Sequence, residues 1–293
     1  MLIDRQARDL PLDAHLHTDL SPDSDVPIDE YARQAVERGI AELAITDHVD
    51  FEPSAPAYDF ATFAQRERTA REAAERWAEH GVAIRFGVEI TWDSRWADDI
   101  RAHLARHAYD FVIGSVHVYR DSPYAARNVA GWVAGRSLAG IVAPYFHEVA
   151  AGARTGLFDT MGHIDFIKRY LAPHVMAADL ATAPELYDPI LLALVDSGTA
   201  LEINTSGLRQ AANETYPSPA IVARYRELGG RAVTVGSDAH QADAFAWALQ
   251  DGYGAARDAG FDQLAFRRGE GRVEVPVPVP ATPAPNGARA GSL

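Results

Sequence analysis

Histidine side chains gather at the ends of the predicted strands of this chain. Six of the eleven histidines lie where an apolar run ends, each with an acidic residue or another histidine nearby. They are His15, His17, His48, His117, His163 and His240, and a further run ends at Glu89. Because the ends of parallel strands meet at one edge of a sheet, we expect these side chains to converge. Imidazole nitrogen and carboxylate oxygen are ligands of divalent metals, so the pattern predicts a metal site.

Two of these motifs place polar side chains two positions apart. His15 and His17 form one such pair, and Asp238 and His240 form the other. Alternate residues of a strand point to the same face, so the members of each pair can reach neighbouring ions. Glu89 ends its own strand and, as a bridging carboxylate, would suit two cations about 3.5–4 Å apart.

The composition excludes several classes of protein. Among 293 residues there is no cysteine, so His, Asp and Glu must supply the metal ligands. A formal net charge of −14 without any basic run argues against nucleic acid as a partner, although a small anionic substrate remains compatible. No apolar run approaches the roughly 20 residues that span a bilayer, which argues against a membrane partner. The N-terminus has no signal-peptide core, so we expect a cytoplasmic protein, whose oligomeric state the sequence does not indicate.

Short apolar runs alternate with amphipathic stretches from residue 10 to about 266. The runs predict buried strands at about 12–16, 42–46, 84–89, 110–116, 159–163, 200–204 and 232–236. The stretches predict helices over 28–38 and roughly over 59–80, 96–107, 136–155, 182–197 and 217–228. This alternation implies parallel pairing. A candidate ligand follows nearly every strand, and this distribution favours a closed or nearly closed barrel over an open sheet with one switch point.

The pattern also divides the chain into one domain and a tail. Residues 1–274 are expected to form a single domain. Residues 275–293 alternate proline with valine and then continue with small polar residues. We expect this segment to be an extended, disordered tail without a function of its own.

The order of the motifs resembles the polymerase and histidinol phosphatase (PHP) superfamily. HxH, TDH, VE, SVH, GHID and SDAH follow one another over about residues 10–270. The stretches 201–209 (LEINTSGLR) and 214–219 (ETYPSP) look like the monofunctional histidinol-phosphatase branch. The resemblance implies an α/β fold, a distorted (βα)7 TIM-like barrel in a single domain, that carries three divalent metal ions (Zn, Fe or Mn).

The resemblance also implies a role for each motif residue. The first ion would be held by His15, His17, Glu89 and Asp238. The second would share Glu89 and add His117 and His163, and the third would be held by Asp23, His48 and His240. Catalysis would involve Glu89, Asp238 and His240, and the substrate phosphate would be bound by Arg209 and Arg169. At Asp23 many family members carry a histidine, so the charge of the third site differs here.

The activity implied by the resemblance is the hydrolysis of L-histidinol phosphate in histidine biosynthesis, by attack of a metal-bridging hydroxide. Alternatives are a phosphoesterase acting on another small phosphate or on nucleotides, an amidohydrolase, and a non-catalytic metal-binding scaffold. Amidohydrolases usually bridge their metals through a modified lysine, whereas here the corresponding strand ends in Glu89. Degenerate scaffolds usually lose ligands, whereas all nine positions here can bind metal.

Several polar residues near the motifs have roles that the sequence leaves open. Lys168 is an alternative candidate to the two arginines for binding the phosphate. Asp47 either orients a ligand or caps a strand end. Asp50, Glu52 and Tyr119 are candidate contacts for a substrate amine or imidazole. The remaining histidines are expected to be solvated or packed, and they are His80, His103, His107, His147 and His174.

Overall fold

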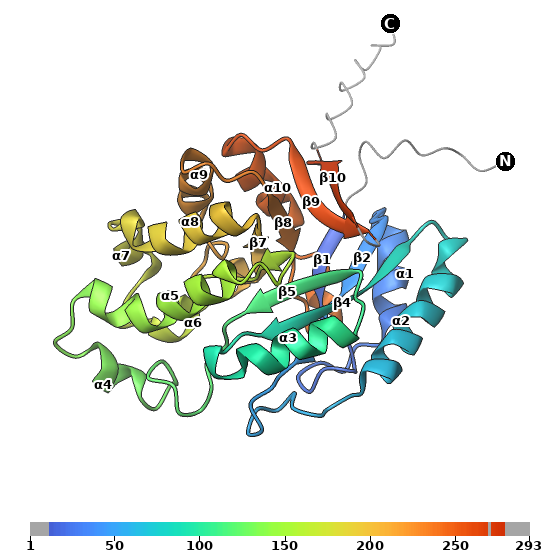
Figure 1. Cartoon of the computed structure of the whole chain (residues 1–293). Coiled ribbons are helices and arrows are strands. Elements are labelled where there is room, and N and C mark those ends of the chain that lie inside the picture. The colour runs from blue at the N-terminus through green and yellow to red at the C-terminus, as the bar shows by residue number, and fades with distance from the viewer. Residues whose placement is uncertain (1–11, 269–270, 279–293) are drawn as a thin grey trace, which may run out of the picture.

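Parallel strands form the centre of the molecule and helices surround them (Figure 1). The computed structural model describes residues 12–268 and 271–278. The central strands are β1 (Leu12–Leu16), β2 (Glu42–Ile45), β3 (His48–Val49), β4 (Ala83–Thr91), β5 (Phe111–Ser115), β6 (Thr160–Met161), β7 (Ala200–Asn204) and β8 (Val233–Gly236). They pair in the order β1-β2-β4-β5-β6-β7-β8, with β3 also paired to β4, and every pair is parallel.

The two edges of this sheet meet beyond the ends of β1 and β8. Leu16 forms a parallel bridge with Ala239. The His17 backbone N–H donates to the Ala239 carbonyl at 3.0 Å, and the Asp238 N–H donates to the His15 carbonyl at 2.9 Å. The sheet therefore closes into a distorted (βα)7 barrel, which confirms the predicted fold class.

Ten α-helices in the described part of the chain lie in the connections between strands. They are α1 (Ile28–Arg38), α2 (Phe63–Ala78), α3 (Ala97–Arg106), α4 (Val129–Val133), α5 (Leu138–Arg154), α6 (Lys168–Leu171), α7 (Ala177–Ala181), α8 (Asp188–Ser197), α9 (Pro219–Glu227) and α10 (Leu249–Asp258). Local signals set several boundaries: Thr62 caps α2 by accepting from the Gln65 N–H, and Gly39 ends α1 at a φ of 71°. The sequence pattern did not predict α10 or the short helices α4, α6 and α7. None of the described helices is both long and apolar enough to cross a membrane.

The strands are buried on both faces, which explains why they read as nearly continuous apolar runs. Leu43, Val88, Ile113, Leu201 and Val235 are all 0% exposed. Burying a side chain of this kind contributes about 1.5–3 kcal/mol to folding. The apolar centre of the barrel fixes the direction of each strand, and with it the place where the polar residue at the strand's end emerges.

The prediction that a disordered tail begins at residue 275 was wrong for its first residues. β9 (Gln263–Arg268) and β10 (Gly271–Pro276) form an antiparallel hairpin in which Val275 pairs with Leu264. Val275 and Val277 are buried, and Phe266 stacks on Phe111 at the start of β5. Alternating valine and proline is a strand pattern of period two, and the missing proline N–H is tolerated on an edge strand. Residues 279–293 of the predicted tail lie outside the described residues.

Candidate metal centre

Strand β1 presents two imidazoles to the same space. His15 and His17 are both 0% exposed, and their Nε2 atoms lie 3.0 Å apart. The Nδ1 atom of His15 lies 2.6 Å from Glu202 Oε1, and that of His17 lies 3.3 Å from Ser21 Oγ. When each Nδ1–H donates to these oxygens, both Nε2 lone pairs point toward one another with no proton between them.

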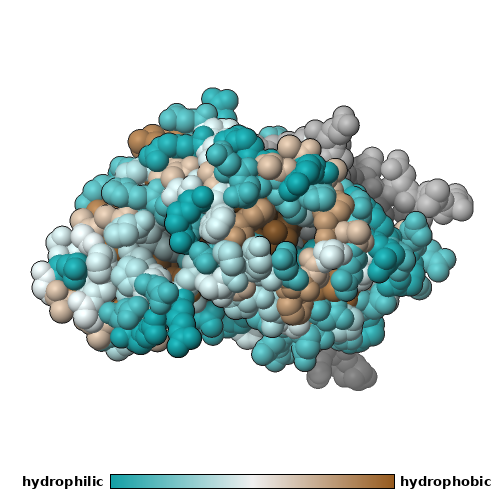
Figure 2. All heavy atoms as spheres, turned by 60° about the horizontal axis from the view of Figure 1, so that its bottom comes forward, coloured by the Kyte–Doolittle hydropathy of each residue, from teal (hydrophilic) through white to brown (hydrophobic). Residues whose placement is uncertain are grey.

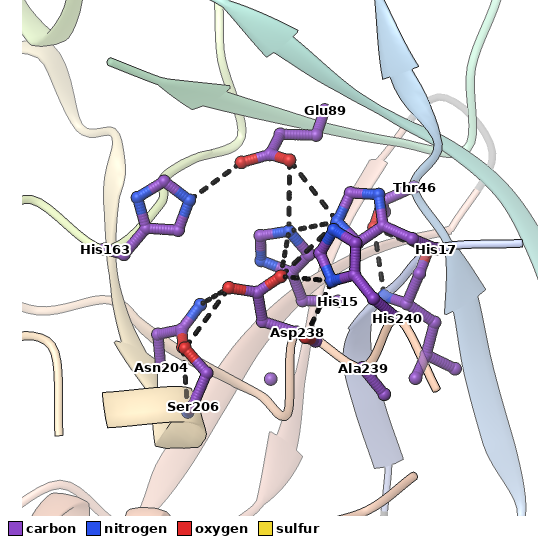
Figure 3. A network of polar contacts seen from close by, with 12 residues as sticks. His15, His17, Thr46, Glu89, His163, Asn204, Ser206, Asp238, Ala239 and His240 are labelled. Atoms are coloured by element: carbon purple, nitrogen blue, oxygen red, sulfur yellow. Dashed lines mark hydrogen bonds and ion pairs between the residues drawn. The ribbon is translucent and has the colours of Figure 1, made fainter. Parts of the chain in front are cut away.

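Glu89, near the end of β4, lies between two groups of histidines (Figure 3). Its Oε2 atom is 3.4 Å from His15 Nε2 and 3.3 Å from His17 Nε2. Its Oε1 atom is 2.9 Å from His163 Nε2 and 3.4 Å from His117 Nε2. The two carboxylate oxygens thus face different imidazole pairs, which is the geometry of a bridging ligand.

A third group lies nearer the surface. Asp23 Oδ2 is 3.4 Å from His48 Nε2 and 3.3 Å from His240 Nε2, and the two imidazole nitrogens are 3.4 Å apart. The side chain of Asp23 is 52% exposed, whereas that of His48 is 11% exposed. His48 also places its Nδ1 atom 2.9 Å from Glu89 Oε2. This group is therefore continuous with the other two and opens to solvent at Asp23.

Asp238 and His163 project from backbone in the left-handed region. Their φ angles are +53° and +24°, values that non-glycine residues rarely adopt. Arg209 donates to the carbonyl oxygens of Ser237 and Asp238 at 2.8 and 2.7 Å. These bonds hold the turn after β8, so that Asp238 Oδ1 lies 3.5 Å from His17 Nε2.

The charges in the cluster favour bound cations. Burial raises the pKa of Glu89 and Asp238, but the nearby imidazoles, His15 first, outweigh burial and hold both pKa values well below their ordinary range. Burial lowers the pKa of His17 well below its usual value, and repulsion from two other histidines acts in the same direction. Burial also opposes charge on His15, but the carboxylates around it, Glu202 first, raise its pKa well above the ordinary value. The acidic ligands are therefore ionised, the form that binds metal.

The cluster has unpartnered buried atoms and closely spaced ligand atoms, which are features of a site for divalent ions. Among the described residues, Glu89 Oε2 and His163 Nδ1 are buried side-chain atoms without a hydrogen bond. Four overlapping groups of three residues place their ligand atoms within 4.8 Å of one another. They are His17–His48–His240, His15–His163–Asp238, His15–His17–Glu89 and His48–Glu89–His117. Three of these groups divide the ligands differently from the family-based assignment, because each of four residues reaches neighbours in more than one group: His15, His17, His48 and Glu89.

A cavity of about 640 Å³ opens over the cluster. Among the residues that line it are Asp23, His48, His117, His163, Asp238 and His240. Arg169 and Arg209 also line it, as do Asp50 and Tyr119. Figure 2, turned so that the bottom of Figure 1 comes forward, shows a mostly hydrophilic surface with a hollow where hydrophobic residues are visible. The cavity thus brings metal ligands, two guanidinium groups and one further carboxylate around a space large enough for a small molecule.

The other candidates for substrate contact do not line the cavity. Lys168 is buried, with its Nζ 2.7 Å from both Asp165 Oδ2 and Glu214 Oε1. Its charge is therefore already paired with carboxylates of the protein. The carboxylate of Glu52 lies 3.0 Å from Arg95, and Glu52 is not among the residues that line the cavity. Of the remaining histidines, His80, His147 and His174 are exposed, and His103 and His107 pack against aromatic rings.

Asp47 combines both of the roles that the sequence left open. It accepts from the Thr18 N–H at 2.6 Å and from Ser21 Oγ at 3.0 Å, and so holds the turn after β1. The same Ser21 Oγ lies beside His17 Nδ1, so Asp47 also helps to orient this imidazole. Sequence reasoning missed Thr91, whose Oγ1 lies 2.9 Å from His117 Nδ1, and Glu202. A polar residue inside an apolar run was the signal that could have found Glu202.

Comparisons with known proteins show which family the chain resembles. A family model described as the PHP domain matches residues 13–206. A probable histidinol-phosphatase of Deinococcus radiodurans is 30% identical over 260 residues, which cover 87% of this chain and 96% of the relative. The histidinol-phosphatase of Lactococcus lactis is 26% identical over 265 residues, with 87% and 93% covered.

Solved structures share the fold. The crystal structure of histidinol phosphate phosphatase from Lactococcus lactis, complexed with zinc, L-histidinol and phosphate, superposes with a TM-score of 0.76. It is 24% identical in sequence, and the match covers 90% of this chain and 98% of that one. A putative histidinol phosphatase from Listeria monocytogenes gives a TM-score of 0.70 at 19% identity, with 82% and 99% covered.

Proposed function

This chain belongs to the PHP domain family, and from that premise we propose that it is a metal-dependent phosphomonoesterase which hydrolyses L-histidinol phosphate to L-histidinol and phosphate. The observation that carries the proposal is the lining of the cavity, which combines the clustered metal ligands with two arginines. Curated relatives of nearly equal length bear the name of this activity.

Within this proposal the nine ligands divide among three divalent ions. The first ion takes His15, His17, Glu89 and Asp238. The second shares Glu89 and takes His117 and His163, and the third takes Asp23, His48 and His240. The separate orientation of the two Glu89 oxygens supports the bridging role. Borderline ions such as zinc, iron or manganese match this set of imidazoles and carboxylates. When bound, such ions supply Lewis acidity toward a phosphoryl oxygen and an acidified water.

The arginines bind and orient the phosphate. Arg209 uses two of its N–H donors on backbone carbonyls, which fixes its guanidinium plane at the cavity wall. Arg169 is exposed and lies beside the rings of Phe166 and Tyr170, with its guanidinium carbon 5.6 and 5.8 Å from their centroids. A guanidinium fork matches phosphate oxygens, so the two side chains hold the ester in one orientation over the ligands.

A further carboxylate of the cavity suits the rest of the substrate. L-Histidinol phosphate carries an ammonium group and an imidazole beside its phosphate. Asp50 follows the metal ligand His48 by two positions, lines the cavity and accepts from the Tyr119 hydroxyl at 3.3 Å. An anionic carboxylate at this position would pair with the ammonium group while the arginines hold the phosphate.

A phosphate-release assay with a panel of substrates tests this function. The metal-loaded protein is compared on L-histidinol phosphate, nucleoside monophosphates and sugar phosphates at equal concentration. We expect kcat/KM to be highest for L-histidinol phosphate, because the arginines match its phosphate and Asp50 matches its ammonium group. A preference for nucleotides would replace the proposed substrate with the nucleotide alternative.

A further inference from the structure

Strand β7 ends beside the cluster but supplies none of the nine candidate ligands. Its residues Glu202 and Asn204 are two positions apart, so they point to the same face of the strand, and both are 0% exposed. A buried carboxylate and a buried amide are costly to fold unless hydrogen bonds satisfy them. Their partners therefore show what this strand end does.

Both oxygens of Glu202 accept hydrogen bonds from residues that carry candidate ligands. Oε1 lies 2.6 Å from His15 Nδ1. Oε2 accepts from the His163 backbone N–H at 2.8 Å and from Asn204 Nδ2 at 3.1 Å. One carboxylate thus fixes the imidazole from β1 and the left-handed backbone of His163 after β6.

Asn204 extends this network to a third ligand (Figure 3). Its Nδ2 also donates to Asp238 Oδ2 at 3.2 Å. Its Oδ1 accepts from Ser206 Oγ at 2.6 Å, and the same hydroxyl lies 3.3 Å from Asp238 Oδ2. Asp238 Oδ2 is held in this way, while Oδ1 stays directed toward His15 and His17.

Two glycines on neighbouring strands leave the space that the Glu202 carboxylate occupies. A Cβ atom at Gly236 would lie 3.0 Å from Glu202 Oε1 and 2.4 Å from His15 Cβ. A Cβ atom at Gly162 would lie 3.3 Å from Glu202 Oε2. The barrel wall is therefore shaped around this carboxylate on both sides.

We propose that Glu202, supported by Asn204, is a positioning residue that keeps the His15 Nε2 lone pair and the His163 turn directed toward the bound metals. Glu202 acts through His15: as long as it accepts the Nδ1 proton, the Nε2 atom is free to bind metal. The inference rests on the metal-binding part of the proposed function and not on the identity of the substrate.

The acceptor requirement makes Glu202→Gln the informative substitution. The side chain keeps its size, but one of its two acceptor oxygens becomes an amide donor. In either amide orientation, the NH2 group then faces the proton of His15 Nδ1 or the His163 N–H. Glu42→Gln is the matched control, because Glu42 is also a buried strand carboxylate, 2.7 Å from Arg85, at the opposite end of the barrel.

The test is a competition for zinc between the full-length, zinc-loaded protein and a colour-forming chelator of known affinity. We expect Glu202→Gln to weaken zinc binding by about 10- to 100-fold, as for other partners of metal-bound histidines. The visible absorption of the cobalt-substituted protein should change as well, whereas Glu42→Gln should match the wild type in both measurements. Wild-type zinc affinity and cobalt spectrum in Glu202→Gln would overturn the proposal.

Asn204→Ala keeps the proposal testable if Glu202→Gln does not fold. It removes one donor to Glu202 and one to Asp238, so a smaller loss of zinc affinity in the same direction is expected. Zinc affinity within twofold of the wild type would count against the network. Because both readouts are metal binding, a failure to hydrolyse L-histidinol phosphate would contradict the proposed function and leave this inference standing.

Discussion

Glu89 is expected to matter most for metal binding, because its two oxygens face different histidine pairs. Such a carboxylate both binds two cations and reduces their mutual repulsion. Replacing Glu89 with glutamine changes the charge of the centre without changing the size of the side chain. The predicted consequence is a defect in metal content and turnover with the barrel intact.

Glu89→Gln should lower the number of bound ions and reduce kcat on L-histidinol phosphate by several orders of magnitude. Metal content is measured by elemental analysis of the purified variant, and the fold is checked by circular dichroism. A variant with full metal content and near-normal turnover would exclude the bridging assignment.

Arg169 offers a cleaner test of phosphate binding than Arg209, since Arg209 also holds the carbonyls of the Asp238 turn. Arg169→Ala should cost about 2–4 kcal/mol of transition-state stabilisation, or roughly 30- to 1000-fold in kcat/KM, with unchanged metal content. Arg136→Ala is the control, because Arg136 is an exposed arginine that also lies over an aromatic ring, 4.1 Å from the centroid of Trp132. Equal activity of the two variants would show that Arg169 does not bind the phosphate.

Asp50 is expected to determine specificity, because it is the carboxylate of the cavity placed apart from the nine ligands. Asp50→Asn should raise KM for L-histidinol phosphate by about 10-fold, the cost of one charge-assisted hydrogen bond. The rate with p-nitrophenyl phosphate, which has no ammonium group, should stay within about twofold. Parallel losses on both substrates would indicate a general effect on the centre instead.

At the scale of elements, the sequence predicted the strands well because each is a short apolar run with a chemically distinct residue at its end. The HxH pair and His163 could be placed at one edge from this pattern alone. Glu202 can be noticed as an acidic residue inside an apolar run, but this signal does not reveal which donors surround it. The pairing of β9 with β10 was missed because proline suggested disorder, although the alternating valines are buried.

The hairpin gives a prediction about stability. Val277→Asp should destabilise the fold by about 1–3 kcal/mol, because it places an unpaired carboxylate at a position that is 6% exposed. Chemical denaturation measures this change. Glu274→Ala, an exposed position on β10, should stay within about 0.5 kcal/mol of the wild type. Similar values for both variants would show that the segment after β9 contributes little to the barrel.

At the scale of the whole molecule, the barrel collects ligands that are far apart in the chain. His15 and Asp238 lie near opposite ends of the sequence, and the bridge between Leu16 and Ala239 brings them together. Metal that binds this assembled site, and not the unfolded chain, stabilises the fold by about 2.7 kcal/mol at 100 times its dissociation constant. Closure of the barrel and occupancy of the centre are therefore expected to reinforce one another.

The most direct test of the account is to strip the full-length protein of metal, titrate it with zinc and follow phosphate release from L-histidinol phosphate. We expect no turnover in the stripped protein and activity that rises to a plateau at about three zinc equivalents, as a three-ion centre requires. Turnover in a verified metal-free sample, or none on this substrate after full reloading, would contradict it.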